Sequence, residues 1–276
     1  MAKKGENHLK GTRVYLSGPM DFVASRAAEK KYGWRSRVSQ FLRSYGVTVF
    51  DPWNKPQIRG LHEYGREDVK SIEVRDKWTF DPGGKGIQDR GECATSFWET
   101  MHIDLRMVDI SDFVIAYCPT NIYSVGTVHE IVMARQQRKP VLFVSPPATF
   151  PTLKELEKEL EGHKKALELL EKLKDELPIK ENEKGIPSLW YMPLVGTESF
   201  FDGFGFNDKR YRRKFRWSDR SDLDQKESIV SPKRPLLKYL ENIAVGILPK
   251  KWDSRSQTLI PDDDWLLMEQ ALPSNR

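Results

Sequence analysis

Cysteine and long apolar runs are scarce in this chain. Its 276 residues include only two cysteines, Cys93 and Cys118, and their separation matches no metal-binding or redox motif. No apolar run approaches the roughly 18–20 residues that cross a bilayer. The N-terminal segment MAKKGENHLKGT lacks the apolar stretch of a signal peptide. These absences predict a soluble, cytoplasmic protein without disulfides, metal sites or a membrane partner.

Charge of one sign is also not in large excess. Lys and Arg total 45 against 40 Asp and Glu, a net charge of +5, and the pI is about 9.0. This favours phosphorylated small molecules or polyanions only mildly and does not define a nucleic-acid binder. Hydrophobic residues make up 38% and charged residues 31%, which indicates a compact part joined to a polar, extended part.

The first half of the chain alternates between strand and helix patterns. Helical spacing of apolar residues occurs over 26–45, 98–111 and 127–138. Strands are predicted within TRVYLSGPM (12–20), VTVFDP (47–52), DFVIAYCP (112–119) and KPVLFVSPP (139–147). Strand–helix–strand units of this length form parallel sheets with right-handed crossovers. The fold class expected is an open, doubly wound α/β sheet over residues 12–148.

The second half has a different character. Leucines recur every three or four residues across 153–178 and predict one long amphipathic helix, an arm within 150–180. Residues 181–276 form a C-terminal extension that could complete the core, with LWYMPLVG (189–196) as a candidate fifth strand and 235–248 as a helix. Basic and aromatic residues alternate in NDKRYRRKFRW (207–217), which suits either nucleic-acid binding or packing on an acidic neighbour.

Doubly wound sheets bind ligands beyond the carboxyl ends of their strands, where the strand order reverses. The loops to consider are Ser17-Gly18-Pro19-Met20-Asp21 and residues 119–127, whose small residues let backbone N–H groups approach a ligand. Glu130 follows the second loop and points towards the same crevice. Thr127 and Glu130 also fit a capping box, in which Glu130 would only cap the helix.

Five segments give this pattern a family resemblance. In order they are VYLSGPM (14–20), DP (51–52), HIDL (102–105), SDFVIAY (111–117) and SVGTVHEIVMARQQRKPVLFV (124–144). Together they resemble the nucleoside 2-deoxyribosyltransferase family and its nucleotide N-glycosidase relatives, over about residues 12–148. The resemblance implies a flavodoxin-like fold and cleavage of the N-glycosidic bond of a nucleoside or nucleotide.

The resemblance also implies roles for individual residues. Glu130 matches the family's nucleophile, Tyr15 the tyrosine that orients it, and Asp104 the aspartate that contacts or protonates the base. Asp112 matches a position with a structural role at the start of the third strand. A carboxylate suits this reaction because departure of the base leaves positive charge on the sugar, which the carboxylate can stabilise or trap.

One position departs from the deoxyribosyltransferases, which have an acidic residue six positions before the nucleophile. Here that position is Ser124, as in the nucleotide N-glycosidases, and a serine can donate to a 5′-phosphate. Ser17, Gly18, Pro19, Ser124 and Gly126 are therefore the expected substrate-binding residues. The acceptor of the sugar is water or a second base, and no residue decides between them.

Other functions stay open at this point. The same fold could serve a non-catalytic nucleotide or nucleic-acid binding protein that uses 207–217, or a glycohydrolase acting on a dinucleotide such as NAD. No cofactor is expected. A homo-oligomer is expected, because relatives complete their sites across subunits and the leucine stripe of 153–177 needs a partner surface.

Overall fold

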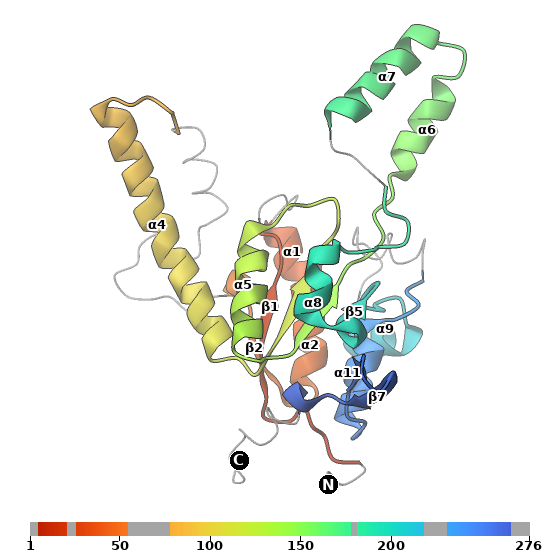
Figure 1. The fold of residues 1–276 in the computed structure, drawn as a ribbon. Coiled ribbons are helices and arrows are strands. Elements are labelled where there is room, and N and C mark those ends of the chain that lie inside the picture. The colour runs from red at the N-terminus through yellow and green to blue at the C-terminus, as the bar shows by residue number, and fades with distance from the viewer. Residues whose placement is uncertain (1–4, 21–25, 55–77, 178–180, 218–230, 266–276) are drawn as a thin grey trace.

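The sheet at the centre of the protein has five parallel strands. Their order, β2-β1-β3-β4-β5, is that of flavodoxin-like folds, so the predicted α/β class is confirmed (Figure 1). The strands are β1 (Arg13–Ser17), β2 (Thr48–Phe50), β3 (Phe113–Tyr117), β4 (Val141–Val144) and β5 (Phe200–Phe201). The structure is a computed structural model that describes residues 5–20, 26–54, 78–177, 181–217 and 231–265.

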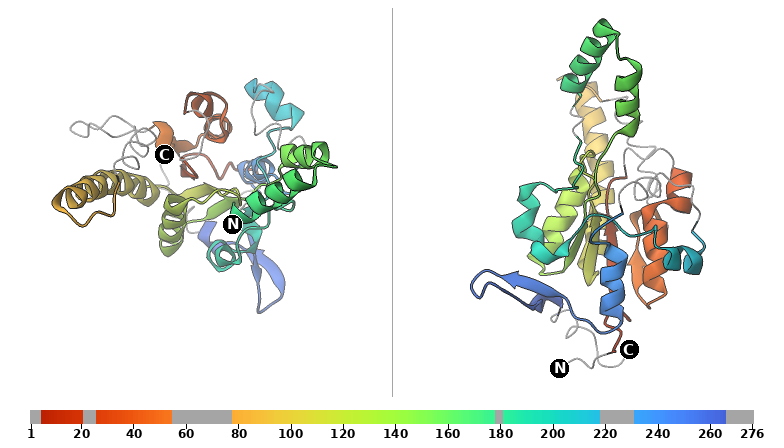
Figure 2. Two further views of the ribbon diagram at one scale, coloured as in Figure 1. Left: turned by 90° about the horizontal axis from the view of Figure 1, so that it is seen from above. Right: turned by 90° about the vertical axis from the view of Figure 1, so that its right-hand side faces the viewer.

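Helices cover both faces of the sheet, and two pieces project from it. The helical hairpin α6–α7 and the N-terminal part of α4 extend away from the body, as Figures 1 and 2 show. An antiparallel hairpin of β6 (Lys250–Asp253) and β7 (Thr258–Pro261) lies outside the main sheet. The α-helices are α1 (Arg26–Tyr32), α2 (Trp34–Arg43), α4 (Gly84–Asp109), α5 (Val125–Gln136), α6 (Pro151–Glu159), α7 (Lys164–Glu176), α8 (Met192–Val195), α9 (Lys209–Phe215) and α11 (Leu236–Ala244). Short 3-10 turns occur at Pro52–Asn54, Leu189–Tyr191 and Thr197–Ser199.

Successive side chains of each strand point to opposite faces of the sheet, so the hydrophobic core has two layers, one on each face. Val14 and Leu16 of β1 belong to the layer that packs against α2 and α11. Tyr15, between them, belongs to the layer that packs against α4, α5 and α8. Side chains buried as completely as these contribute about 1.5–3 kcal/mol each. The side chains of β1 with odd numbers therefore face α5, which decides how the site is built.

The last third of the chain supplies one edge of this core. β5 pairs in parallel with β4, and α11 buries Leu236, Leu240 and Ile243 against the first layer. Trp265 packs on Phe113 of β3 with ring centroids 5.4 Å apart. The helix predicted in 235–248 is confirmed. No described helix is long and apolar enough to cross a membrane.

The prediction of a fifth strand at 189–196 was wrong. Leu189–Tyr191 form a 3-10 turn and α8 follows, with Pro193 in its first turn. A short apolar run does not distinguish a buried strand from a buried helix, and proline suits the start of a helix. The fifth strand is Phe200–Phe201, which is too short for a strand pattern to show in the sequence.

The single long helix predicted over 153–178 was also wrong. α6 ends at Glu159 and α7 begins at Lys164, and between them Gly162 has a φ of 91°, a conformation that glycine adopts without strain. The helix predicted over 26–45 is likewise two helices, which meet at Gly33.

α4 is longer than the sequence indicated. It begins at Gly84 instead of residue 98 and runs for 26 residues, about 39 Å. Its first part contains three glycines, which lower helix propensity and conceal the helix in the sequence pattern. The range 53–98, for which the sequence pattern predicted no helix or strand, therefore includes half of a long helix. Residues 55–77 of that range lie outside the described residues.

Asp112 has the structural role that the resemblance implied. Its Oδ2 accepts a hydrogen bond from the Arg13 backbone N–H at 2.7 Å, and its Oδ1 accepts one from Arg13 Nη2 at 2.9 Å. The Asp112 backbone N–H donates in turn to the Arg13 carbonyl. These bonds fix the start of β3 beside the start of β1, and so align the strand ends that carry the site.

Candidate active site

Glu130 lies on the buried face of α5. Thr127, Glu130, Ile131 and Ala134 are the buried residues of this helix, at the spacing of one helical face. The Glu130 side chain points across this face to β1. Its neighbour His129 is exposed and lies on the pocket wall described below.

Two hydroxyl groups of β1 hold the Glu130 carboxylate. Tyr15 Oη donates to Oε1 at 2.7 Å, and Ser17 Oγ donates to Oε2 in a short hydrogen bond. Tyr15 and Ser17 lie two residues apart on one strand, so their side chains point to the same face of the sheet. Both carboxylate oxygens thus have a donor, which fixes the orientation of the group.

This arrangement excludes the interpretation that Glu130 only caps α5 in a capping box. α5 begins at Val125, with Ser124 at the N-cap, and Thr127 lies inside the helix. The Ser124 hydroxyl bonds to Thr127 Oγ1 at 2.8 Å and not to a backbone N–H. The Glu130 carboxylate is directed to β1 instead of back to the start of the helix.

Burial changes the acidity of the site. Burial and the neighbouring Asp104 carboxylate raise the pKa of Glu130 from its ordinary value of 4.5 to about 7. The hydrogen bonds from Ser17 and Tyr15 and the positive charge of Arg35 act in the opposite direction. Burial also raises the pKa of Tyr15 well above 10, so Tyr15 stays a hydrogen-bond donor. Near neutral pH, Glu130 can therefore gain or lose its proton.

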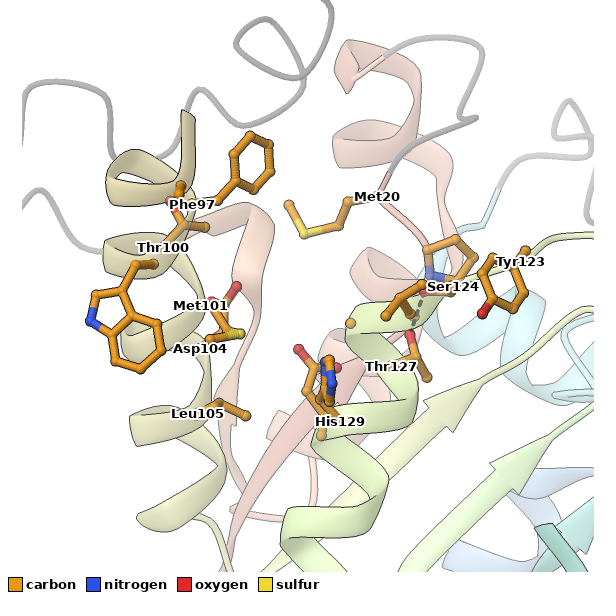
Figure 3. A pocket seen from close by; sticks show the side chains of 17 residues that line it. Met20, Phe97, Thr100, Met101, Asp104, Leu105, Tyr123, Ser124, Thr127 and His129 are labelled. Carbon is orange, nitrogen blue, oxygen red and sulfur yellow. Dashed lines mark hydrogen bonds between the residues drawn. The ribbon is translucent and has the colours of Figure 1, made fainter. Parts of the chain in front are cut away.

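Asp104 reaches the site from α4. Its side chain is 9% exposed, and it lies one turn from Met101 and next to Leu105 on the face of α4 that lines the pocket. Figure 3 shows Asp104 on the α4 side and the first turn of α5 opposite. The structure thus brings together the three residues that the resemblance singled out, Tyr15, Asp104 and Glu130.

A pocket of about 620 Å³ opens above these carboxylates. This volume lies in the range of small-molecule sites. One wall is apolar and comes from α4, with Phe97, Met101 and Leu105 (Figure 3). Trp98 of the same helix also lines the pocket. The loops after β1 and β3 and the first turns of α5 form the rest, so the pocket lies at the switch point between these strands, as predicted.

The predicted substrate-binding residues divide into two groups. Gly18, Pro19, Ser124 and Gly126 line the pocket, and no atom would contact a Cβ at Gly126. Ser17 is fully buried beneath the pocket and holds Glu130. Asp21 of the first loop lies outside the described residues.

Sequence reasoning missed Arg35, whose side chain is 1% exposed. Its guanidinium donates to three carbonyl oxygens at the end of β1 and in the loop after it: Gly18 at 2.7 Å, and Leu16 and Pro19 at 3.4 Å each. The only signal in the sequence is the dipeptide Trp34-Arg35 at the start of a helix. The pocket residues Phe97 and Trp98 were also missed: the helix predicted over 98–111 begins only at Trp98, and the earlier turns of α4, which include Phe97, were not predicted.

The basic segment 207–217 uses its aromatic rings for packing. Tyr211 and Trp217 are buried; Tyr211 meets Phe41 edge-on at 5.4 Å, and Trp217 Nε1 donates to Gln40 at 2.7 Å. These two rings cannot stack on bases in this conformation. Nucleic-acid binding through this segment stays an untested prediction.

One acidic cluster has the geometry of a cation site. Carboxylate oxygens of Asp262, Asp263 and Asp264 lie within 4.8 Å of one another. Arg135 of α5 pairs with Asp264 at 2.8 Å, and Arg138 pairs with Asp263 at 3.1 Å. The cluster thus ties the C-terminal segment to α5 through ion pairs.

Comparisons with known proteins add little to what the fold and the pocket show. No family model matches the chain, and no curated protein matches it. A solved 2-deoxyribosyltransferase from the psychrotolerant bacterium Bacillus psychrosaccharolyticus is 20% identical, with 50% of this chain and 75% of that chain covered and a TM-score of 0.28. A conserved protein from Enterococcus faecalis V583 is 18% identical, with 49% and 64% covered and the same TM-score. Because these similarities are so low, the fold class rests on the strand order: the protein is a flavodoxin-like α/β protein with an acidic pocket at its switch point.

Proposed function

We propose that this protein cleaves the N-glycosidic bond of a nucleoside or nucleoside 5′-monophosphate, with Glu130 as nucleophile. The observation that carries the proposal is the Glu130 carboxylate, held by Tyr15 and Ser17 at the pocket floor with Asp104 opposite. Two carboxyl groups facing one pocket are the groups that glycosidic cleavage needs. The sequence resemblance to nucleoside deoxyribosyltransferases supports the same reaction.

In the first step, a Glu130 oxygen bonds to C1′ of the sugar while the bond from C1′ to the base nitrogen breaks. The electron pair of that bond leaves with the base. Asp104 supplies a proton or a hydrogen bond to the base as this charge develops. Tyr15 and Ser17 keep the carboxylate in one orientation, so little entropy is lost when it attacks.

In the second step, an acceptor attacks C1′ and releases the Glu130 carboxylate. If the acceptor is water, its proton passes to the Asp104 carboxylate and the product is a free sugar. If the acceptor is a second base, the product is a new nucleoside. Nothing in the described pocket selects between them, so both outcomes belong to the proposal.

The wall of α4 suits the planar base of such a substrate. Phe97, Trp98 and Met101 offer apolar surface, and Asp104 adds one polar group at the inner end of this wall. A 5′-phosphate would be met by the first turn of α5, where Ser124 and the backbone N–H groups near Gly126 lie. No Lys or Arg in the described part of the chain lines the pocket.

The direct test is release of free base, measured by chromatography. The panel contains deoxyribonucleosides, ribonucleosides, their 5′-monophosphates and NAD, each with and without a second base as acceptor. We expect base release from at least one nucleoside or monophosphate, and its loss in Glu130→Gln. Release only from NAD would favour a dinucleotide glycohydrolase. Binding without release from any donor would contradict the proposal.

A further inference from the structure

Arg35 is a buried cation directly behind the floor of the pocket. It lies on α2, and its guanidinium has two carboxylates nearby, Glu29 at 3.8 Å and Asp51 at 3.9 Å. Its strongest hydrogen bond, at 2.7 Å, goes to the carbonyl oxygen of Gly18. A fully desolvated arginine is costly unless it has good partners, and here backbone carbonyls at the end of β1 and in the loop after it provide several of them.

The segment that Arg35 contacts, residues 16–19, contains Ser17, the last residue of β1. The three carbonyls belong to Leu16, Gly18 and Pro19, so the guanidinium spans both sides of Ser17. Arginine can do this because its donors form a rigid planar fork. The hydrogen bonds from this guanidinium set the path of the backbone at Ser17, and with it the direction of the Ser17 hydroxyl.

Aromatic rings pack against the Arg35 guanidinium and hold it in place. Arg35 stacks on the indole of Trp34 at 4.7 Å, and this ring stacks on Phe204 at 5.4 Å. A Cβ at Gly18 would come within 2.9 Å of Trp34 Cζ2, so only glycine fits between loop and ring. Trp34 therefore contacts both the Arg35 guanidinium and the backbone at Gly18.

We propose that Arg35 is a positioning residue of the active site: it fixes residues 16–19, at the end of β1 and the start of the following loop, and, through Ser17, the Glu130 carboxylate. This inference rests on the proposed function, in which that carboxylate is the nucleophile. The positive charge of Arg35 also acts on Glu130 and lowers its pKa. Tyr15 and Ser17 of β1 and Asp104 of α4 also act on Glu130, and burial together with the charge of Glu130 raises the pKa of the half-buried Cys118.

The two contributions of Arg35 can be separated with two variants. Arg35→Lys keeps the positive charge but loses the planar fork, whereas Arg35→Gln loses the charge as well. Arg37→Lys is the matched control, because Arg37 is equally buried on the same helix but packs on Phe206 and Trp217, away from the pocket.

Two readouts are needed, and only one of them depends on activity. The first is kcat for base release, corrected for the folded fraction. The second is the titration of the Glu130 carboxyl carbon by NMR in protein labelled at the glutamate carboxyls, with the signal assigned by its loss in Glu130→Gln.

We expect Arg35→Lys to lower kcat by about 10- to 100-fold, as misplacement of a reacting group does, with little change in the Glu130 titration. Arg35→Gln should lower kcat further and move the titration of Glu130 to higher pH. Arg37→Lys should match the wild type in both readouts. If Arg35→Gln does not fold, the result for Arg35→Lys alone tests the proposal.

Wild-type kcat in Arg35→Lys would overturn the proposal, and so would an unchanged Glu130 titration in folded Arg35→Gln. A kcat loss of equal size in Arg37→Lys would show a general effect of buried arginines and would also overturn it. If the wild type releases no base at all, the proposed function fails, and the titration still decides whether Arg35 acts on Glu130.

Discussion

The raised pKa of Glu130 predicts that Glu130→Gln makes the protein more stable at high pH. In the folded protein this pKa is about 7, against an ordinary value of 4.5. The difference of about 2.5 units corresponds to about 3 kcal/mol at 1.36 kcal/mol per unit. Because the pKa is raised on folding, this group favours the folded state at pH below 4.5, and that contribution is lost as pH rises through 7.

A glutamine in place of Glu130 would be neutral at every pH, so the variant would not lose stability in this way as pH rises. It presents one acceptor oxygen to Tyr15 and Ser17 where the carboxylate presents two, which costs about 1 kcal/mol. Above about pH 8 the variant should therefore be more stable than the wild type by about 2 kcal/mol. Near pH 4.5 this advantage should be absent, because the folded wild type then carries the carboxyl group in its protonated form.

The assay is urea unfolding of both proteins at pH 5, 6, 7 and 8, with Glu155→Gln as control. Glu155 lies exposed on α6, so its replacement should change the free energy of unfolding little at any pH. If Glu130→Gln differs from the wild type by the same amount at every pH, Glu130 does not carry the raised pKa. A variant less stable than the wild type at pH 8 would also refute the reasoning.

Further predictions concern activity and assembly. Asp104→Asn should slow base departure by about 10²-fold and move the rise of rate with pH, which reports ionisation of Glu130, to lower pH. Ser124→Asp should weaken use of monophosphates more than of nucleosides, and a wild type that prefers nucleosides would contradict our interpretation of Ser124. Gly18→Ala should lower kcat, because the new methyl group would lie against Trp34. Wild-type kinetics in this variant would show that the loop can shift to make room for the methyl group. Light scattering at micromolar concentration should show a dimer or larger assembly, and a monomer would count against the leucine stripe as a contact surface.

Much of the fold was predictable because its signals are local. The four longer strands have continuous apolar runs, and α5 and α11 have helical spacing. The location of the pocket followed from strand order, which brings the loops after β1 and β3 together. The misplaced elements lack a local signal: β5 has two residues, and glycines conceal the start of α4.

The site was predictable only in part. Tyr15, Asp104 and Glu130 came from the resemblance and meet in the structure. Ser17 was expected to contact substrate, whereas its hydroxyl holds Glu130, a contact between residues 113 positions apart. Arg35 resembles an ordinary polar residue on a helix, and only tertiary packing reveals that it is buried against the loop. Such long-range contacts leave no periodicity in a single sequence.

The most direct test of the proposed mechanism is to trap the sugar on Glu130. An excess of enzyme is mixed with the best donor from the base-release panel, stopped with acid within one turnover, digested and examined by mass spectrometry. Our account predicts that the peptide containing Glu130 gains the mass of the sugar residue, and that Glu130→Gln neither gains it nor releases base. Base release without any adduct, together with full activity in Glu130→Gln, would contradict the assignment of Glu130 as nucleophile.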